Sequence, residues 1–178
     1  MSEQIHPAPQ QEPEQTLSEL LQIRRDKLKA LQTEGRDPFQ ITRYQVTART
    51  AEIKERFDTM EGSMVSVAGR LMSKRGMGKA MFCDLQDGSG RIQIYVRIDE
   101  LGEEEFSLFK KYDIGDIVGV RGEVFRTNRG EISVRAGSVT LLAKSLLPLP
   151  EKFHGLTDLE TRYSQRYVDL IVNPEVRR

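Results

Sequence analysis

The strongest constraint on this sequence is a change of hydrophobic period at Ser63. From there, apolar and polar residues alternate, as they do in strands that bury one face. Five such runs occur, at residues 65–71, 81–85, 91–96, 117–126 and 131–142. Between the third and fourth runs, residues 99–112 lose the alternation and place Leu101, Phe106 and Phe109 at helical spacing. The chain is therefore predicted to have an all-β core with one helix inserted after its third strand.

Three strands, a helix and two strands form the order of an OB-fold, a five-stranded Greek-key barrel that binds oligonucleotides across its second and third strands. Turn sequences support this order. Asp87-Gly88-Ser89-Gly90 is expected to close a hairpin, and Thr127-Asn128-Arg129-Gly130 joins the last two strands. The glycine-rich, basic segment 74–79 is predicted to be a loop between the first two strands. The predicted fold is an OB-fold barrel with flanking helices.

Two amphipathic helices are expected before the barrel. The first follows Thr16 and Glu19, which are spaced as a capping box, and stops at Gly35. Its apolar stripe contains Leu17, Leu20, Leu21, Leu28 and Leu31. The second helix is expected to contain Val46, Ile53, Phe57 and Met60 and to end near Gly62. Both helices are expected to pack on the barrel through their apolar sides.

A linker and a further helix are predicted after the barrel. The linker is Pro148-Leu149-Pro150, stiffened by its prolines, and Thr157 with Glu160 is spaced as a capping box for the helix. The helix carries Leu159, Tyr163, Tyr167 and Leu170, and this stripe is expected to pack on a following domain or another subunit. The predicted plan is a disordered lead at 1–16, a helical extension at 17–62, the barrel at 63–145, and the linker and helix at 146–178.

Composition narrows the classes of function. Cys83 is the only cysteine, so the chain cannot form an internal disulfide or a multi-cysteine metal site, and Cys83 itself is expected to be a core thiol. Basic and acidic residues number 27 each, so affinity for nucleic acid must come from local clustering. No apolar run approaches the roughly 18 residues of a membrane span, and the lead lacks the layout of a signal peptide. A cytoplasmic protein is therefore expected.

The outward faces of the second and third strands carry the candidate binding residues. Phe82 offers a ring on which an unpaired base can stack, and Gln93 offers a donor and an acceptor to a base edge. Arg70 and Arg75 add positive charge for phosphates or bases, and Glu131 lies at the mouth of the last hairpin. The sequence shows no nucleophile with its base, no clustered metal ligands and no GxxxxGK[ST] phosphate loop. The pattern indicates a binding site without a catalyst.

Each candidate also has a plainer interpretation. Phe82 is compatible with a surface aromatic that covers the barrel end, and Gln93 with a solvated strand residue. The basic segment is compatible with an ordinary solvated turn. Glu131 is compatible with a cross-strand charge partner. The pattern alone leaves these alternatives open.

Several segments of the barrel and the tail match a known family. In the barrel they are Val67-Ala68-Gly69-Arg70-Leu71-Met72, Met77-Gly78-Lys79-Ala80-Met81-Phe82, Leu85-Gln86-Asp87 and Arg91-Ile92-Gln93. These resemble the anticodon-binding domain of bacterial lysine–tRNA ligases, of class II, subclass b. Aspartate and asparagine ligases share the barrel, but the tail segments at 147–156 and 162–170 resemble the lysine enzymes. The resemblance covers about residues 17–178.

The resemblance implies that the domain binds the uridine-rich anticodon loop of tRNA(Lys). It assigns stacking on the central base to Phe82, and contacts with neighbouring base edges to Gln93, Arg70, Arg75 and Glu131. It also implies that the full-length enzyme is a homodimer that uses ATP and magnesium to form lysyl-adenylate and then transfers lysine to tRNA. The family's catalytic motifs do not occur before Arg178, so this chain alone is expected to bind tRNA without activating lysine.

Two other functions remain open at this point. One is a free-standing OB-fold protein that binds single-stranded nucleic acid. The other is the equivalent domain of an aspartate or asparagine ligase, which would prefer an anticodon loop that contains guanine.

Overall fold

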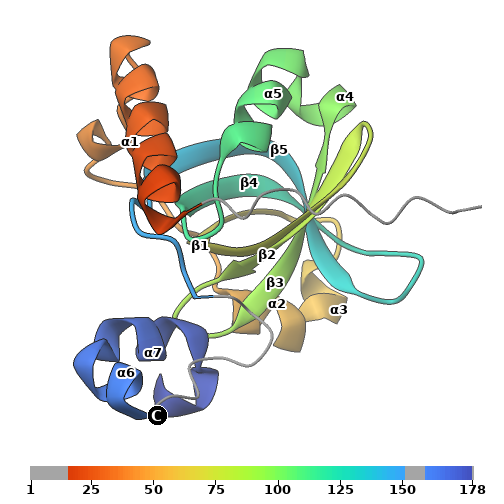
Figure 1. Cartoon of the computed structure of the whole chain (residues 1–178). Helices are drawn as coiled ribbons and strands as arrows, with labels where there is room; N and C mark the ends of the chain where they lie inside the picture. The colour runs from red at the N-terminus through yellow and green to blue at the C-terminus, as the bar shows by residue number, and fades with distance from the viewer. Residues whose placement is uncertain (1–15, 151–158, 178) are drawn as a thin grey trace, which may run out of the picture.

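The computed structural model describes residues 16–150 and 159–177, and its centre is a closed five-stranded barrel (Figure 1). The strands are β1 (Met64–Met77), β2 (Ala80–Gln86), β3 (Arg91–Arg97), β4 (Ile117–Arg126) and β5 (Ile132–Ala143). They close in the order β1-β2-β3-β5-β4, with the β3–β5 pair parallel and the others antiparallel. The helices α4 (Ile98–Leu101) and α5 (Glu103–Lys111) follow β3. The predicted OB-fold is confirmed.

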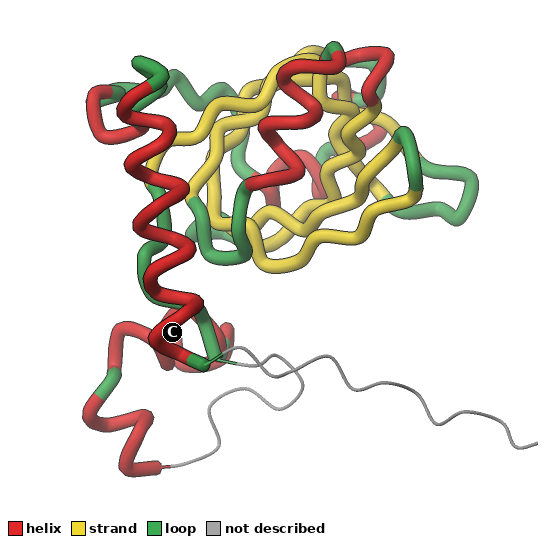
Figure 2. The backbone as a smooth tube through the Cα atoms, turned by 45° about the horizontal axis from the view of Figure 1, so that its top comes forward, coloured by secondary structure: helices red, strands yellow, loops and turns green. Residues whose placement is uncertain are grey.

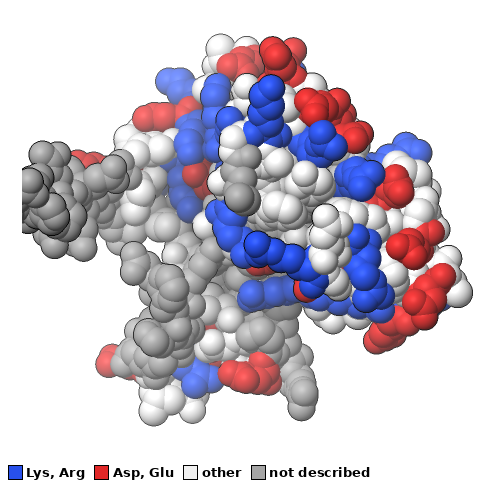
Figure 3. Space-filling model, turned by 90° about the vertical axis from the view of Figure 1, so that its right-hand side faces the viewer, with Lys and Arg blue, Asp and Glu red and all other residues white. Residues whose placement is uncertain are grey.

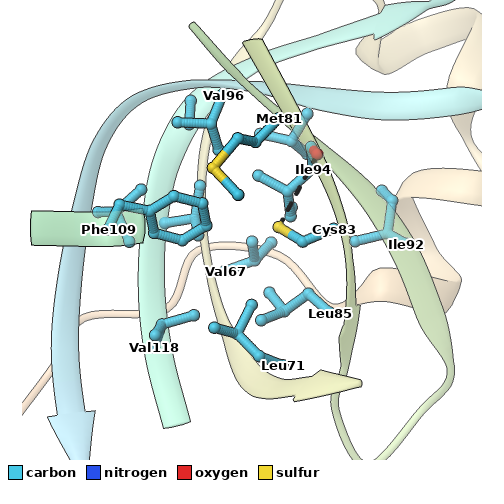
Figure 4. Close-up of a cluster of buried hydrophobic side chains, with 14 of the residues drawn as sticks. Val67, Leu71, Met81, Cys83, Leu85, Ile92, Ile94, Val96, Phe109 and Val118 are labelled. Carbon is cyan, nitrogen blue, oxygen red and sulfur yellow. Dashed lines mark hydrogen bonds between the residues drawn. The ribbon is translucent and has the colours of Figure 1, made fainter. Parts of the chain in front are cut away.

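The barrel interior is filled by the alternate apolar residues of the strands and by α5. Figure 4 shows side chains such as Leu71, Leu85 and Phe109 converging on one cluster, in which Leu71 and Leu85 are fully buried. Cys83 belongs to this cluster, and burial raises the pKa of its thiol to about 12, so the prediction of a core thiol is confirmed. Because neighbouring strand residues point to opposite faces, the intervening side chains of β2 and β3 face away from the core.

The first strand is longer than expected, so the prediction of a loop is wrong for residues 74–77. These residues continue β1 and pair with β2 from Lys74↔Cys83 to Met77↔Ala80. The connection shrinks to a tight turn, at which Gly78 has a φ of 62°, in the left-handed region that glycine tolerates. The ladder of backbone hydrogen bonds with β2 overrides the loop preference of the local composition.

The first helix was correctly predicted. α1 (Leu17–Thr33) begins after Thr16, whose hydroxyl and the Glu19 carboxylate form the expected capping box. Figure 2 shows α1 on the outside of the strands. Both Leu31, which joins the core, and polar side chains hold α1 there. Arg24 donates to the carbonyls of Ile114 and Ser145, each at 3.0 Å, whereas Leu17 is 63% exposed.

The second predicted helix is shorter than expected and is interrupted. The turn η1 (Pro38–Gln40) is followed by α2 (Thr50–Glu55) and α3 (Phe57–Met60), and Val46 lies outside both helices. The preceding segment instead runs along β1, where the Thr47 N–H donates to the Ser66 carbonyl at 2.9 Å. This long-range bond removes the first turn of the expected helix.

Beyond the barrel, the predicted helix is divided into α6 (Leu159–Ser164) and α7 (Arg166–Val172), followed by η2 (Pro174–Arg177). α7 contacts the barrel, since the Gln86 amide donates to the Ile171 carbonyl at 3.1 Å. Thr157 and, apart from Thr16, the predicted disordered lead lie outside the described residues. Within the part of the chain that is described, no helix combines the length and apolar character needed to cross a membrane.

Candidate nucleic-acid interface

An open groove of about 870 Å³ lies across the outward faces of β2, β3, β4 and β5. Its lining consists of Arg75, Phe82, Asp84, Gln93, Tyr95, Phe125, Arg126, Thr127, Asn128, Arg129, Glu131 and Arg135. Figure 3 views the side of the molecule on which the β1–β2 and β4–β5 turns project, and Lys and Arg side chains surround an uncharged area there. The groove therefore combines aromatic rings with basic side chains.

A row of three aromatic rings and one arginine forms the floor of the groove. Phe82 and Tyr95 occupy paired positions on β2 and β3 and stack, with ring centroids 4.7 Å apart and planes at 25°. Tyr95 in turn lies 6.0 Å from Phe125, and the guanidinium carbon of Arg135 lies 4.7 Å from the Phe125 centroid. Tyr95 thus supports one face of Phe82, which remains only half-buried and outside the core.

Gln93 lies on the same face as Phe82, opposite Asp84 in the β2–β3 ladder. The Asp84 carboxylate accepts a hydrogen bond from the Ser73 hydroxyl. The Gln93 side-chain amide makes no hydrogen bond to any described residue. Its donor and its acceptor are therefore both available to a ligand beside the Phe82 ring.

The charge of the groove is positive and largely uncompensated. Its lining contains four arginines against two acids, Asp84 and Glu131, which leaves a surplus of two positive charges. Within the described ranges, none of the four arginines forms an ion pair, whereas Glu131 lies 3.7 Å from the Lys54 ammonium. Unpaired arginines in a groove attract phosphates and can also stack on or fork onto bases.

Comparison with known proteins agrees with this geometry. Residues 65–142 match the model of a family described as an OB-fold nucleic acid binding domain. The chain is 56% identical over 161 residues to the lysine–tRNA ligase of Moorella thermoacetica, a match that covers 90% of this chain and 33% of that protein. The chain is a homologue of lysine–tRNA ligases. Two further lysine–tRNA ligases match it similarly. The enzyme of Pelotomaculum thermopropionicum is 54% identical over 164 residues, which cover 92% of this chain and 32% of that protein. The enzyme of Clostridium perfringens strain ATCC 13124 is 52% identical over 166 residues, which cover 93% of this chain and 33% of that protein.

The chain spans about a third of the length of these ligases. Of the five residues predicted to bind RNA, Phe82, Gln93, Arg75 and Glu131 line the groove together. Arg70 does not line it, because its guanidinium donates to the Gly115 carbonyl at 2.7 Å. The structure therefore places four of the five predicted residues in one site and sets Arg70 apart.

Sequence reasoning missed Phe125, Arg126, Arg129 and Arg135 as groove residues. The alternation in β4 and β5 marks Phe125 and Arg135 as outward-facing, which was the available signal. The parallel pairing of β5 with β3 sets Arg135 opposite Tyr95, and the alternation gives no sign of this pairing. Only closure of the barrel brings these residues beside Phe82.

Lys74, in the same basic segment as Arg75, has a structural role and does not line the groove. Its ammonium donates to the carbonyls of Phe109, Lys110 and Tyr112 at 3.1, 2.8 and 2.6 Å, at the C-terminal end of α5. Burial lowers the pKa of Lys74, and the nearby Asp113 carboxylate opposes that shift. A cation at this position stabilises the negative end of the helix dipole.

We expect Lys74→Met to reduce stability without changing affinity for uridine-rich RNA. The loss of three hydrogen bonds at the helix end should cost about 1 to 3 kcal/mol, or roughly 2 to 4 °C in melting temperature for each kcal/mol. Arg75→Gln is the matched control on the same strand, with the opposite expected profile. Thermal denaturation and fluorescence anisotropy measure the two properties, and equal losses of affinity in both variants would assign Lys74 to the RNA site after all.

The groove offers rings, an amide and guanidinium groups, which suit stacking, hydrogen bonding and phosphate binding. Among the residues described, no group of three or more His, Cys, Asp or Glu side chains could hold a metal ion.

Proposed function

We propose that this chain is the anticodon-recognition part of a lysine–tRNA ligase and that its groove binds the anticodon loop of tRNA(Lys). The observation that carries the proposal is the half-buried Phe82 ring, which borders an open groove with the Gln93 amide beside it and unpaired arginines around it. The shared name of the relatives supports lysine rather than aspartate or asparagine.

Phe82 and Gln93 together suit an unpaired uridine. The ring supplies a stacking surface that is already fixed by Tyr95, so little conformational freedom is lost when a base arrives. The Gln93 amide can donate to a uracil carbonyl and accept from its N3–H. Glu131 adds an acceptor for a further base edge, while Arg75 and Arg129 lie where phosphates can approach.

We assign recognition to this groove and lysine activation to the longer enzyme, of which this chain would be about a third. In that enzyme, ATP and Mg²⁺ would support formation of lysyl-adenylate, followed by transfer of lysine to tRNA. The groove residues would position the tRNA and take no part in the chemistry. The isolated chain is accordingly expected to bind tRNA without charging it, and the homodimer is proposed for the full-length enzyme.

Phe82→Ala is expected to weaken binding of the lysine anticodon stem-loop by about 5- to 150-fold, since base stacking contributes about 1 to 3 kcal/mol. Fluorescence anisotropy titration with a labelled stem-loop measures the change. Phe39→Ala is the matched control, because Phe39 is a 49% exposed ring outside the groove and its loss should leave affinity unchanged.

Two results would contradict the proposal. Undiminished affinity in Phe82→Ala would remove the stacking site. Preference of the parent chain for a guanine-containing loop over the lysine loop would reassign the chain to aspartate or asparagine.

A further inference from the structure

Arg135 lies at the far end of the aromatic row and has no acidic partner among the described residues. Its guanidinium rests on Phe125, with the guanidinium carbon 4.7 Å from the ring centroid. It forms no ion pair or side-chain hydrogen bond with any residue in the described ranges. We propose that Arg135, seated on Phe125, binds an oxygen acceptor of the nucleotide next to the one stacked on Phe82. This inference rests on the proposed function of the groove and adds a specific contact to it.

Strand pairing and burial hold Arg135 in one place. On β5 it is opposite Tyr95 of the parallel neighbour β3 and Glu123 of the antiparallel neighbour β4. Its Nε atom is buried and has no hydrogen-bond partner, whereas neither terminal Nη atom is among the buried unpaired atoms. The stem is therefore enclosed, and the two Nη groups are the part of Arg135 that a ligand in the groove can reach.

The neighbouring acids do not neutralise this charge. Glu123, the cross-strand neighbour, forms no ion pair with Arg135. The groove acid Glu131 is instead engaged by Lys54 at 3.7 Å. A half-buried arginine that lacks an acceptor is costly, because a buried unsatisfied donor typically destabilises a protein by an amount comparable to a lost hydrogen bond. This cost lies at the enclosed Nε atom, whereas the terminal Nη groups keep their N–H donors available for an acceptor that RNA supplies.

The geometry suits an oxygen acceptor of a nucleotide. A guanidinium stacked on a ring directs its N–H groups outward in a plane, which matches the paired oxygens of a phosphate or a base carbonyl. The row from Phe82 through Tyr95 to Phe125 leads along the groove floor to Arg135. A strand that stacks one base on Phe82 and follows this row brings its next nucleotide toward Arg135.

The experiment compares Arg135→Gln, Arg135→Lys and Arg121→Gln in the whole chain, titrated with the lysine anticodon stem-loop. Arg121 is exposed on β4 outside the groove and has no side-chain partner in the described residues, so its replacement removes the same charge without the contact. We expect Arg135→Gln to weaken binding at least about tenfold and Arg121→Gln by less than about twofold. Arg135→Lys should recover only part of the loss, because lysine keeps the charge but not the planar fork. Melting temperatures confirm that each variant is folded.

Two further arms identify the acceptor. If Arg135 binds a phosphate, Arg135→Gln should lower the slope of log affinity against log salt by about one, equally for every loop sequence. If Arg135 binds a base carbonyl, the salt slope of Arg135→Gln should equal that of the parent chain. When the loop uridines are replaced one at a time by cytidine, Arg135→Gln should lose the preference for uridine over cytidine at one loop position. Either result supports the inference.

Equal losses of stem-loop affinity in Arg135→Gln and Arg121→Gln would overturn the inference. Full recovery of affinity in Arg135→Lys would also overturn it, because positive charge alone would then explain the binding. Phe82→Ala, measured in parallel, distinguishes failure of the Arg135 contact from failure of the whole groove as the binding site. Loss of affinity in Phe82→Ala with none in Arg135→Gln removes only the Arg135 contact. No loss in Phe82→Ala removes the groove as the binding site.

Discussion

Replacing Lys144 with methionine is expected to lower the free energy of unfolding by about 3 to 5 kcal/mol. The Lys144 side chain is 1% exposed, and its ammonium donates to Asp113 at 2.7 Å and to Asp116 at 2.8 Å. Methionine would fill the space but leave Asp116, which is wholly buried, without its counter-charge. Removing one partner of a buried ion pair costs this much because the remaining charge can neither be solvated nor paired.

Lys27→Met is the matched control for this prediction. Lys27 pairs with the same Asp113 at 2.6 Å, but its side chain is 33% exposed, so its loss should cost about 1 kcal/mol or less. Burial opposes ionisation of Asp113, yet its hydrogen bonds from Lys144 and Lys27 outweigh this effect and lower its pKa. Urea denaturation at neutral pH measures both variants, and equal small losses would show that solvent reaches the Lys144 site.

The barrel could be predicted from sequence because burying one face of a strand imposes a period of two. The same alternation that sends Ile94 inward sends Gln93 and Tyr95 outward, so the part of the groove on β2 and β3 followed directly from the pattern. The bond from Lys74 to Phe109 spans 35 positions in the chain, and nothing in the local sequence indicates it. Arg135 was missed for a related reason, since its place beside Tyr95 depends on the parallel pairing of β5 with β3, which forms only when the barrel closes.

The error in the second helix has a similar origin. One helical stripe fits Val46, Ile53 and Phe57, but α2 begins only at Thr50, where a residue of the β2–β3 turn caps it. There the Asp87 carboxylate accepts from both the Thr50 N–H and the Thr50 hydroxyl, at 2.9 and 2.7 Å. These hydrogen bonds also lower the pKa of Asp87, although burial acts in the opposite direction. A cap supplied by a distant residue leaves no signal in the helix sequence itself.

Gly122→Ala is expected to disrupt both the barrel and the groove, because a Cβ at this position would lie 1.9 Å from the Arg135 carbonyl oxygen and 2.7 Å from its carbon. Both are backbone atoms, so no side-chain rotation can relieve the overlap. β4 and β5 would have to separate at the register shift between Arg121 and Gly122, and we expect a loss of about 3 kcal/mol or more. Since Arg135 is the residue displaced, stem-loop affinity should fall as well.

Gly137→Ala tests whether the effect is specific to that close approach. Its Cβ would lie 3.7 Å from the Arg121 carbonyl oxygen, an ordinary contact, so the stability change should stay within about 0.5 kcal/mol and binding should persist. Urea denaturation and stem-loop titration of both variants, at a temperature where each is folded, measure the two effects. If Gly122→Ala matched its parent in stability, the two strands could separate without cost. The register that places Arg135 on Phe125 would then not depend on glycine, and the link between barrel closure and groove geometry would fail at this point.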